Sequence, residues 1–243
     1  MTQTLTTYPK YLADFQALDQ SAPWLQRLRE QAWSHFEALG FPTARRANER
    51  WKYTNVAPIA NASFGNTPVS GSSPAMDAQE LQRCALWQPD WINLVFVNGR
   101  YVSDLSTPSS TTKVQAGSLA KSDYQGLMQQ YLGRYADSGE DGFTALNTAF
   151  VQDGAFVHAP AGEALDQVVH LIYITTDGDQ PVVTHPRTLI VAGANSNVRV
   201  VESYYSSTDS QHFTNAVTEI VLDPGANVDH CLVMLENTSA FHI

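Results

Sequence analysis

Cysteine is almost absent from this chain of 243 residues, which contains only Cys84 and Cys231. The two lie far apart in segments of different character, so they form neither a disulfide framework nor a paired zinc motif. Free thiols are suited to a reducing compartment, and residues 1–15 lack the basic head and apolar core of a secretion signal. We therefore predict a cytoplasmic protein.

Basic residues are also scarce. The chain has 14 lysines and arginines against 24 aspartates and glutamates, and its formal net charge is -10. Such a charge repels phosphate backbones and anionic lipid, and no basic cluster offsets it, which argues against nucleic acid as a partner. No apolar run approaches the roughly 20 residues of a membrane helix, so we expect no membrane span.

Motifs for catalysis are missing as well. The sequence has no glycine-rich loop for a nucleotide phosphate and no nucleophile elbow of a serine hydrolase. Seven histidines are present, but none has the spacing of a zinc motif, and we interpret most of them as ordinary surface or strand residues. We predict no catalytic residue, no bound cofactor and no metal site, with Cys231 as the one candidate metal ligand.

Residues 1–75 are interpreted as a small helical domain with a linker. A helix is predicted from Pro23 to Gly40, because proline suits a first helical turn and apolar residues recur at helical spacing up to the glycine. Residues 41–60 combine charges with aromatic rings, which indicates a docking or anchoring segment. Residues 61–74 are rich in serine, glycine, asparagine and proline and are interpreted as turns or a linker.

Residues 76–142 are predicted to mix helices and strands as a lead-in to the last segment. Asp77 has the capping-box position ahead of a short helix. An apolar strand over 92–97 is followed by Asn98-Gly99, a pair typical of a tight turn into a second strand. A longer helix is expected over 118–135.

From residue 143 to 243 the sequence predicts strands with no helix among them. Short β-rich runs are separated by glycine, proline, asparagine or aspartate. These runs cover residues 155–158, 168–175, 187–191, 198–205, 213–222 and 228–235. Ile190–Asn195 and Leu222–Asn227 each lead through a Gly-Ala-Asn turn into a strand, which favours stacked β-coils around one apolar core. A β-sandwich is the rival architecture.

Residues 239–243 have the composition of another strand, and no polar tail follows them. We expect a chain that is truncated at its C-terminus within the β-structure. Because an unpaired strand edge invites pairing with another chain, a homodimer through this open β-edge is a further expectation.

An ordered series of motifs resembles the SufB/SufD family of iron–sulfur cluster assembly proteins, and its SufD members above all. The first motif consists of Arg50, Trp51, Lys52, Tyr53 and Thr54, preceded by Phe41-Pro42 and by residues 45–49. Later matches follow in the family's order at Val95–Arg100, Ala145–Phe150, Arg187–Val191, Val200–Tyr204 and Asn215–Ile220. No single motif is highly specific, but the series covers nearly the whole chain.

The resemblance implies a mainly β fold in which a small helical N-terminal domain precedes a right-handed parallel β-helix, incomplete here over 143–243. It also implies that SufB and SufC are partners of the full-length protein, and that the SufBCD complex as a whole handles the iron–sulfur cluster. The family's main docking regions for both partners fall outside this sequence. We therefore carry over no catalytic, metal or docking residue and keep only the Arg50–Thr54 motif as a family feature.

Several side chains leave two interpretations open. Cys231 is either a thiolate ligand or sulfur acceptor, or a small core residue, and its residue type favours the core. Cys84, on a predicted helix, favours the core more strongly. Trp51 and Tyr53 either anchor the N-terminal region on the strands or contact a partner, and the anchor is favoured. His230 is adjacent to Cys231 in a predicted strand, so the two should face opposite sides and not chelate together.

The primary functional hypothesis is a non-catalytic scaffold subunit of the SufBCD system. One alternative is an enzyme on a β-solenoid or cupin-like fold. A cupin would show clustered histidine and glutamate, and a solenoid lyase would show grouped aspartates and basic residues, but the sequence has neither pattern. The other alternative is a generic β-rich binding module, which the missing secretion signal disfavours.

Overall fold

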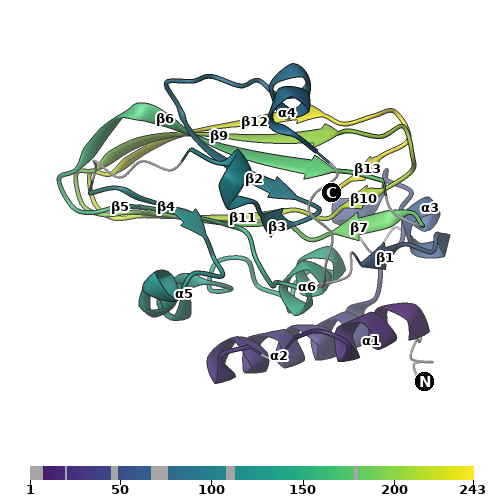
Figure 1. The fold of residues 1–243 in the computed structure, drawn as a ribbon. Helices are drawn as coiled ribbons and strands as arrows, with labels where there is room; N and C mark the ends of the chain where they lie inside the picture. Colours follow the sequence, from purple (N-terminus) through teal and green to yellow (C-terminus); the bar gives the residue numbers. More distant parts are fainter. Residues whose placement is uncertain (1–7, 20, 45–48, 67–75, 108–112, 178–179) are drawn as a thin grey trace.

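The computed structural model describes residues 8–19, 21–44, 49–66, 76–107, 113–177 and 180–243. Within these ranges the chain forms helices and three sheets of mostly parallel strands (Figure 1). The helices are α1 (Pro9–Gln16), α2 (Pro23–Leu39), α3 (Ala57–Asn61), α4 (Ala78–Cys84), α5 (Gln125–Tyr131) and α6 (Gly142–Ala149). Single 3₁₀ turns span Glu49–Trp51, Ser103–Leu105 and Ser122–Tyr124.

Each sheet joins strands that are far apart in the sequence. The first sheet contains β1 (Gly65–Asn66), β7 (Val182–Thr184), β10 (Phe213–Thr214) and β13 (Phe241–His242), in that order. The second contains β11 (Val217–Leu222), β8 (Arg187–Ala192), β5 (Ala155–Ala159) and β4 (Gln115–Ser118). The third contains β12 (Asn227–Leu235), β9 (Asn197–Ser206), β6 (Ala164–Thr175), β2 (Ile92–Val97) and β3 (Arg100–Tyr101).

From β6 onward, successive strands belong to the three sheets in a repeating order. β6, β7 and β8 lie in the third, first and second sheets, and β9, β10 and β11 repeat this order, after which β12 and β13 begin it again. All pairings between these strands are parallel, whereas β3 and β4 pair antiparallel with β2 and β5. The chain therefore winds in coils, and each coil stacks on the one before it.

The turn that leads into each third-sheet strand repeats from coil to coil. Gly162, Asn195 and Gly225 occupy the same position of the turn and have φ values of 77°, 57° and 76°. Only glycine and, at some cost, asparagine adopt this left-handed conformation readily. The sequence repeat aligned Asn195 with Asn227, which is wrong by two residues. Asn227 pairs with Asn197, 30 positions earlier, and its side-chain amide donates to the Asn197 Oδ1 at 3.2 Å.

Aromatic rings stack through the coil interior in register. Phe96, Tyr173 and Tyr204 lie on β2, β6 and β9 as direct neighbours, with ring centroids 4.8 and 5.1 Å apart. Inward-facing valine, leucine and isoleucine side chains fill the space beside this stack. Parallel register repeats the same interior position in each coil, and this is the geometry that makes one continuous core from short strands.

Helices α1, α2, α5 and α6 cover one side of the coils, with α5 and α6 next to the strands and α1 and α2 outside them, while α4 lies on the opposite side (Figure 1). Aromatic side chains of α1, α2 and α6 form one core cluster with residues of the first sheet. At Gly142 an added Cβ would lie 1.9 Å from the Gly40 carbonyl oxygen, so the end of α2 and the start of α6 approach backbone to backbone. No helix in the described ranges is long and apolar enough to cross a bilayer.

Most predicted elements are confirmed. The helix from Pro23 ends before Gly40, where φ is 63°, and Asp77 caps α4 by accepting from the Gln79 and Glu80 amides. The predicted strands match β5, β6, β8, β9 and β12 to within a few residues at each end. The run at 213–222 is two strands, β10 and β11, because the chain turns between sheets at Asn215-Ala216.

Two expectations about helices are wrong. The predicted helix over 118–135 is reduced to α5. Ser118 belongs to β4, a 3₁₀ turn spans Ser122–Tyr124, and Gly133 has a left-handed φ of 73° just after the helix. The helix α6 lies where only strands were expected. Asp141 caps it by accepting from the Phe143 and Thr144 amides, and all its residues except Thr144 are buried. A helix buried around its circumference has no amphipathic period, so periodicity could not reveal it.

Some predictions fall on residues that the structure does not describe. Residues 45–48 of the family motif and residues 67–75 of the expected linker lie outside the described ranges. The division into three segments at residues 75 and 142 stays a prediction. Strands from the two sides of residue 142 share one sheet, because β2 pairs with β6.

Candidate functional site at the open end of the coils

The last coil leaves inward-facing side chains exposed. Leu232 and Met234 of β12 are in register with Glu202 and Tyr204 of β9. The β9 residues are 1% and 2% exposed, but Leu232 is 50% and Met234 is 57% exposed. Ile220 of β11, in register with the buried core residue Ile190, is also exposed. The coil interior is therefore open to solvent at this end.

The strands at this end are also edges. In the described part of the chain, β11, β12 and β13 each lie at an edge of their sheet. Their outer backbone groups have no neighbouring strand, and such groups readily accept a strand from another chain. Apolar side chains and unpaired strand edges thus occur together on one surface, which we call the open end.

A buried carboxylate lies directly beneath the open end. Glu202 accepts hydrogen bonds from His230 Nε2 at 2.9 Å, from the Thr218 hydroxyl at 2.9 Å and from the Thr188 hydroxyl at 3.0 Å. Burial raises the pKa of Glu202, but the hydrogen bonds from His230, Tyr204 and Thr218 more than offset it, so the pKa lies below its usual value. The carboxylate is ionised and fully engaged.

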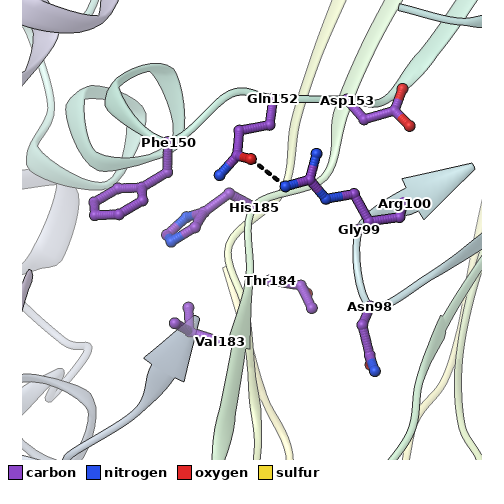
Figure 2. A pocket seen from close by; sticks show the side chains of 9 residues that line it. All are labelled: Asn98, Gly99, Arg100, Phe150, Gln152, Asp153, Val183, Thr184 and His185. Carbon is purple, nitrogen blue, oxygen red and sulfur yellow. Dashed lines mark hydrogen bonds between the residues drawn. The ribbon is translucent and has the colours of Figure 1, made fainter. Parts of the chain in front are cut away.

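Most of the seven histidines lie at surface or strand positions, as expected, but three of them are buried, including His170 on β6. His170 lies between Ser203 and Asn93, with Nε2 2.7 Å from the serine hydroxyl, and burial lowers its pKa to about 4. His185 stacks on Phe150, and burial lowers its pKa to about 3 (Figure 2). Both rings are therefore neutral at pH 7.

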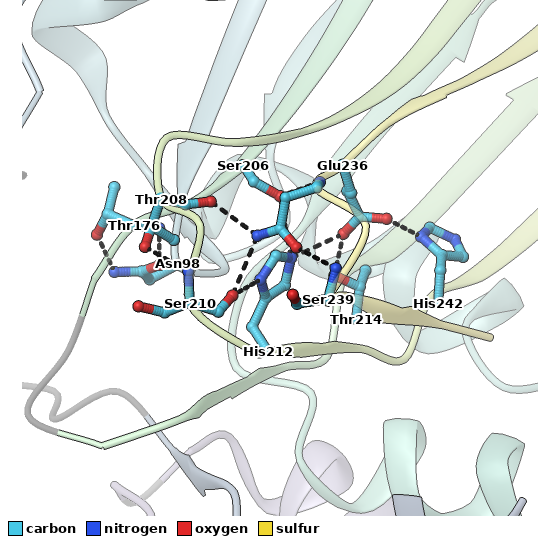
Figure 3. A network of polar contacts seen from close by, with 11 residues as sticks. Asn98, Thr176, Ser206, Thr208, Ser210, His212, Thr214, Glu236, Ser239 and His242 are labelled. Atoms are coloured by element: carbon cyan, nitrogen blue, oxygen red, sulfur yellow. Dashed lines mark hydrogen bonds and ion pairs between the residues drawn. The ribbon is translucent and has the colours of Figure 1, made fainter. Parts of the chain in front are cut away.

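The third buried histidine, His212, belongs to a polar network at the open end (Figure 3). Glu236 contacts His242 Nδ1 at 2.6 Å, the Thr214 hydroxyl at 2.6 Å and His212 Nε2 at 3.3 Å. Burial raises the pKa of Glu236, but the hydrogen bonds from His212, His242 and Thr214 more than offset this effect and lower the pKa to about 2. This network joins β10, β13 and the end of β12.

Sequence patterns did not single out Glu202 and Glu236. A signal existed for Glu202: it has the same parity along β9 as the inward residues Val198 and Val200, so strand alternation places a charge inside the coil. Glu236 directly follows β12 and had no such signal. Its two histidine partners are 24 and 6 residues away and come together only through the coil geometry.

The Arg50–Thr54 motif lies on the helical side, where Trp51 packs against the core cluster of α1, α2 and α6. Trp51 Nε1 donates to Asp141 Oδ2 at 2.9 Å, and its ring lies 5.1 Å from that of Phe143. Trp51 therefore attaches its segment to the start of α6, as an anchor does. Tyr53 is 89% exposed and anchors nothing, and Arg50 forms an exposed ion pair with Glu140.

The structure separates the two side chains of the His230–Cys231 pair, as strand alternation predicts. His230 faces Glu202, whereas Cys231 is exposed, so the favoured interpretation of Cys231 as a core residue is wrong. Cys84 is half-buried against the core cluster beneath α4, and burial raises the pKa of its thiol. Within the described ranges, no three histidine, cysteine or acidic residues are placed to hold a metal ion.

Comparison with known protein families accounts for both parts of the chain. Residues 3–171 match the SufBD protein N-terminal region, and residues 173–243 match the SufBD core domain of the SUF system for FeS cluster assembly. The junction between the two matches falls within β6.

Several curated relatives agree with these matches. An iron–sulfur cluster assembly SufBD family protein of Synechocystis is 30% identical over 208 residues, covering 81% of this chain and 45% of the relative. SufD of Escherichia coli is 27% identical, covering 87% and 47%, and SufD of Bacillus subtilis is 26% identical, covering 93% and 52%. The chain spans about half the length of these relatives. It belongs to the SufBD family of iron–sulfur cluster assembly proteins.

Proposed function

We propose that this chain acts as a non-catalytic scaffold subunit of a SufBCD-type system, and that its open end accepts a strand from a second copy of the chain. Two of the relatives above are named SufD, and all three are named as iron–sulfur cluster assembly proteins. None of the three is a cupin, a lyase or an adhesion module. We further propose that the stacked coils are a right-handed parallel β-helix and that the protein works in the cytoplasm.

The open end carries this proposal. Three edge strands of three sheets end on one face, with Leu232, Met234 and Ile220 exposed beside them. A partner strand could extend the sheets through backbone hydrogen bonds, while its side chains cover the exposed interior. Covering a leucine or methionine side chain contributes about 1.5–3 kcal/mol, so a few such residues suffice for a stable contact.

The polar groups near the open end support a structural role for this chain. Glu202 and Glu236 are each surrounded by hydrogen-bond donors from neighbouring strands. A general base or a metal ligand needs a lone pair directed at its substrate or ion, whereas these lone pairs are engaged within the fold. Chemistry on the cluster is then a property of the assembled complex.

Pull-down and self-association together test the proposal. Purified chain is mixed with SufB and with SufC from the same source, and each complex is measured by pull-down. We expect SufC alone to be captured weakly or not at all, because the family's docking regions fall outside this sequence. A Leu232→Lys/Met234→Lys variant should lose self-association, while the exposed Tyr53→Ala should retain it.

Three outcomes contradict parts of the proposal. A wild-type chain that stays monomeric over the concentration series overturns the proposed role of the open end. Strong capture of SufC alone overturns the partner assignment. Hydrolysis of ATP by the purified chain overturns its non-catalytic nature. Light scattering over a concentration series tests the homodimer, which the same double substitution should dissociate.

A further inference from the structure

A cavity of about 260 Å³ lies on the helical side of the coils. Its walls come from α2, α5, the start of β3 and the connections after β4 and α6. Asp19 and Ala120 are part of the lining and are exposed, so the cavity reaches the surface. The strand pairing proposed above does not involve these elements.

Two arginines face this cavity. Arg29 of α2 is only 3% exposed; its Nε donates to the Val151 carbonyl at 2.7 Å and its Nη1 to the Asp19 carbonyl at 3.1 Å. Its other terminal nitrogen has no hydrogen-bond partner among the described residues. Burial and then the charge of Arg100 lower the Arg29 pKa to about 10, so the guanidinium is charged at pH 7.

Neither arginine has a carboxylate partner. Arg100 donates to the side-chain oxygen of Gln152, and no ion pair within the described ranges involves Arg29 or Arg100. Asp19 is the one acidic residue in the lining, and its exposed carboxylate is screened by water. Arg29 is buried and Arg100 is half-buried. Buried charge is costly unless it is paired, so the Arg29 guanidinium, which is bound by two carbonyls and no carboxylate, favours an anion in this cavity.

A smaller cavity of about 40 Å³ adjoins the first, and Arg100 and Gln152 line both (Figure 2). His185 also lines the smaller cavity, and its Nε2 is buried without a hydrogen-bond partner in the described structure. Its Nδ1 accepts from the Asn215 amide, which leaves the proton of the neutral ring on Nε2. The smaller cavity therefore offers one unfilled N–H donor. Its lining also includes Asp153, whose carboxylate accepts from the Tyr101 amide and the Ser118 hydroxyl.

The opposite wall of the larger cavity is apolar. Leu25 of α2 and Leu119, Met128 and Leu132 from the α5 region line it, and all four are buried. An inorganic anion would leave this wall in contact with water. A ligand with an anionic end and an apolar body would contact both the arginines and the leucines.

We propose that this cavity binds a small organic carboxylate, with its anionic group between Arg29 and Arg100 and its apolar body against Leu25 and Met128. Guanidinium groups recognise carboxylates through paired hydrogen bonds, and their charge favours such an anion over a neutral analogue. The volume lies below the range of about 300–1,000 Å³ usual for drug-sized ligands, which excludes nucleotides and flavins and suits a small acid.

Calorimetric titration with four probes tests the proposal on the whole chain. Hexanoate and phenylacetate carry a carboxylate on an apolar body, hexanamide is the neutral counterpart of the first, and sulfate lacks the apolar body. We expect saturable binding of at least one organic acid, with hexanamide and sulfate binding at least tenfold more weakly. Equal affinity for hexanoate and hexanamide, or no saturable binding of either acid, overturns the proposal.

Two variants locate the binding. Arg100→Gln removes one charge and should weaken binding of the organic acid at least tenfold. The acid should then no longer raise the unfolding temperature of the variant. Ala22→Leu adds volume inside the cavity without removing a charge, and it should abolish binding while leaving the fold intact. If Arg100→Gln does not fold, Ala22→Leu decides. Unchanged affinity in a folded variant of either kind contradicts the assigned position.

Discussion

Arg187 and Glu219, on neighbouring strands of successive coils, form an ion pair in which both side chains are 1% exposed. Arg187 also donates to Asn147 and Thr148 of α6, while Glu219 accepts from the backbone amides of Gly133 and Tyr135. Burial raises the pKa of Glu219, but the Arg187 charge and these amides more than offset it and hold the pKa below its usual value. One buried pair thus joins two coils, α6 and the segment after α5.

Substitution of Arg187 tests the energetic weight of this pair. Arg187→Met leaves the Glu219 carboxylate buried without its counter-charge, and we expect a loss of about 3–5 kcal/mol in the free energy of unfolding. Urea denaturation measures it. Arg50→Met, which breaks the exposed pair with Glu140, should cost less than about 1 kcal/mol. Equal costs for the two variants would show that the buried pair contributes no more than a surface one.

The stability of the fold should decrease in acid because of its buried histidines. The unfolded chain takes up a proton on His170 below the ordinary pKa of 6.5, whereas the folded chain does so only near pH 4. The stability contributed by the neutral ring is thus complete above pH 6.5 and is lost as pH falls to about 4. At about 1.4 kcal/mol per pKa unit this amounts to about 3 kcal/mol.

Denaturation midpoints between pH 7.5 and pH 4.5 measure this effect. His170→Asn should flatten the pH dependence by about one proton, whereas Ser203→Ala removes a hydrogen bond of the same ring and should leave the slope unchanged. An unchanged slope in His170→Asn would contradict a neutral, buried His170. Glu236 affects stability in a lower pH range. The stability contributed by its ionised carboxylate is lost as pH falls from 4.5 to about 2.

Trp51 and Tyr53 should respond differently to truncation. Trp51→Ala removes the contact with Phe143 and the hydrogen bond to Asp141, and we expect a loss of about 2 kcal/mol because the ring is half-buried. Tyr53→Ala should change the unfolding free energy by less than about 0.5 kcal/mol. Thermal or urea unfolding of both variants measures the difference. A larger loss of stability in Tyr53→Ala than in Trp51→Ala would contradict the role of Trp51 as an anchor.

The left-handed turn positions predict an order of stabilities. In Gly162→Ala the added Cβ contacts no other atom. The substitution should therefore lower the free energy of unfolding by about 1 kcal/mol, through the left-handed backbone conformation alone. Gly225→Ala should cost more, since its new Cβ would lie 2.3 Å from Asn195 Oδ1. Asn195→Gly should be nearly neutral or slightly stabilising. Urea denaturation of the three variants gives the order, and a reversed order of the two alanine variants would contradict the turn alignment.

Strands and turns of the coils were accessible from the sequence because each strand is bounded by glycine, proline, asparagine or aspartate. The runs around β5, β8 and β12 predicted real strands, and periodicity predicted α2. Helix α6 was not accessible, since burial around its circumference erases the amphipathic period. The predicted register between coils is wrong because the two sequence copies were aligned on identical residue types. The positions that correspond in the structure, Asn195 and Gly225, share a left-handed backbone conformation and not a residue type.

The candidate site was less predictable than the fold. Membership of the SufBD family followed from ordered motifs, but those motifs are mostly buried strands and the Trp51 anchor. Exposure of Met234 depends on which strand is last in its sheet, and this is a property of the stacked coils. The partners of Glu236 likewise come from β10 and β13, which meet only after winding.

Hydrogen exchange at low and high protein concentration tests the proposed role of the open end most directly. If a second copy adds to the edge strands, amide exchange in β12, residues Asn227–Leu235, should slow at high concentration, with little change in α1 and α2. Self-association with unchanged exchange in β11, β12 and β13, or with protection confined to the N-terminal helices, would contradict it.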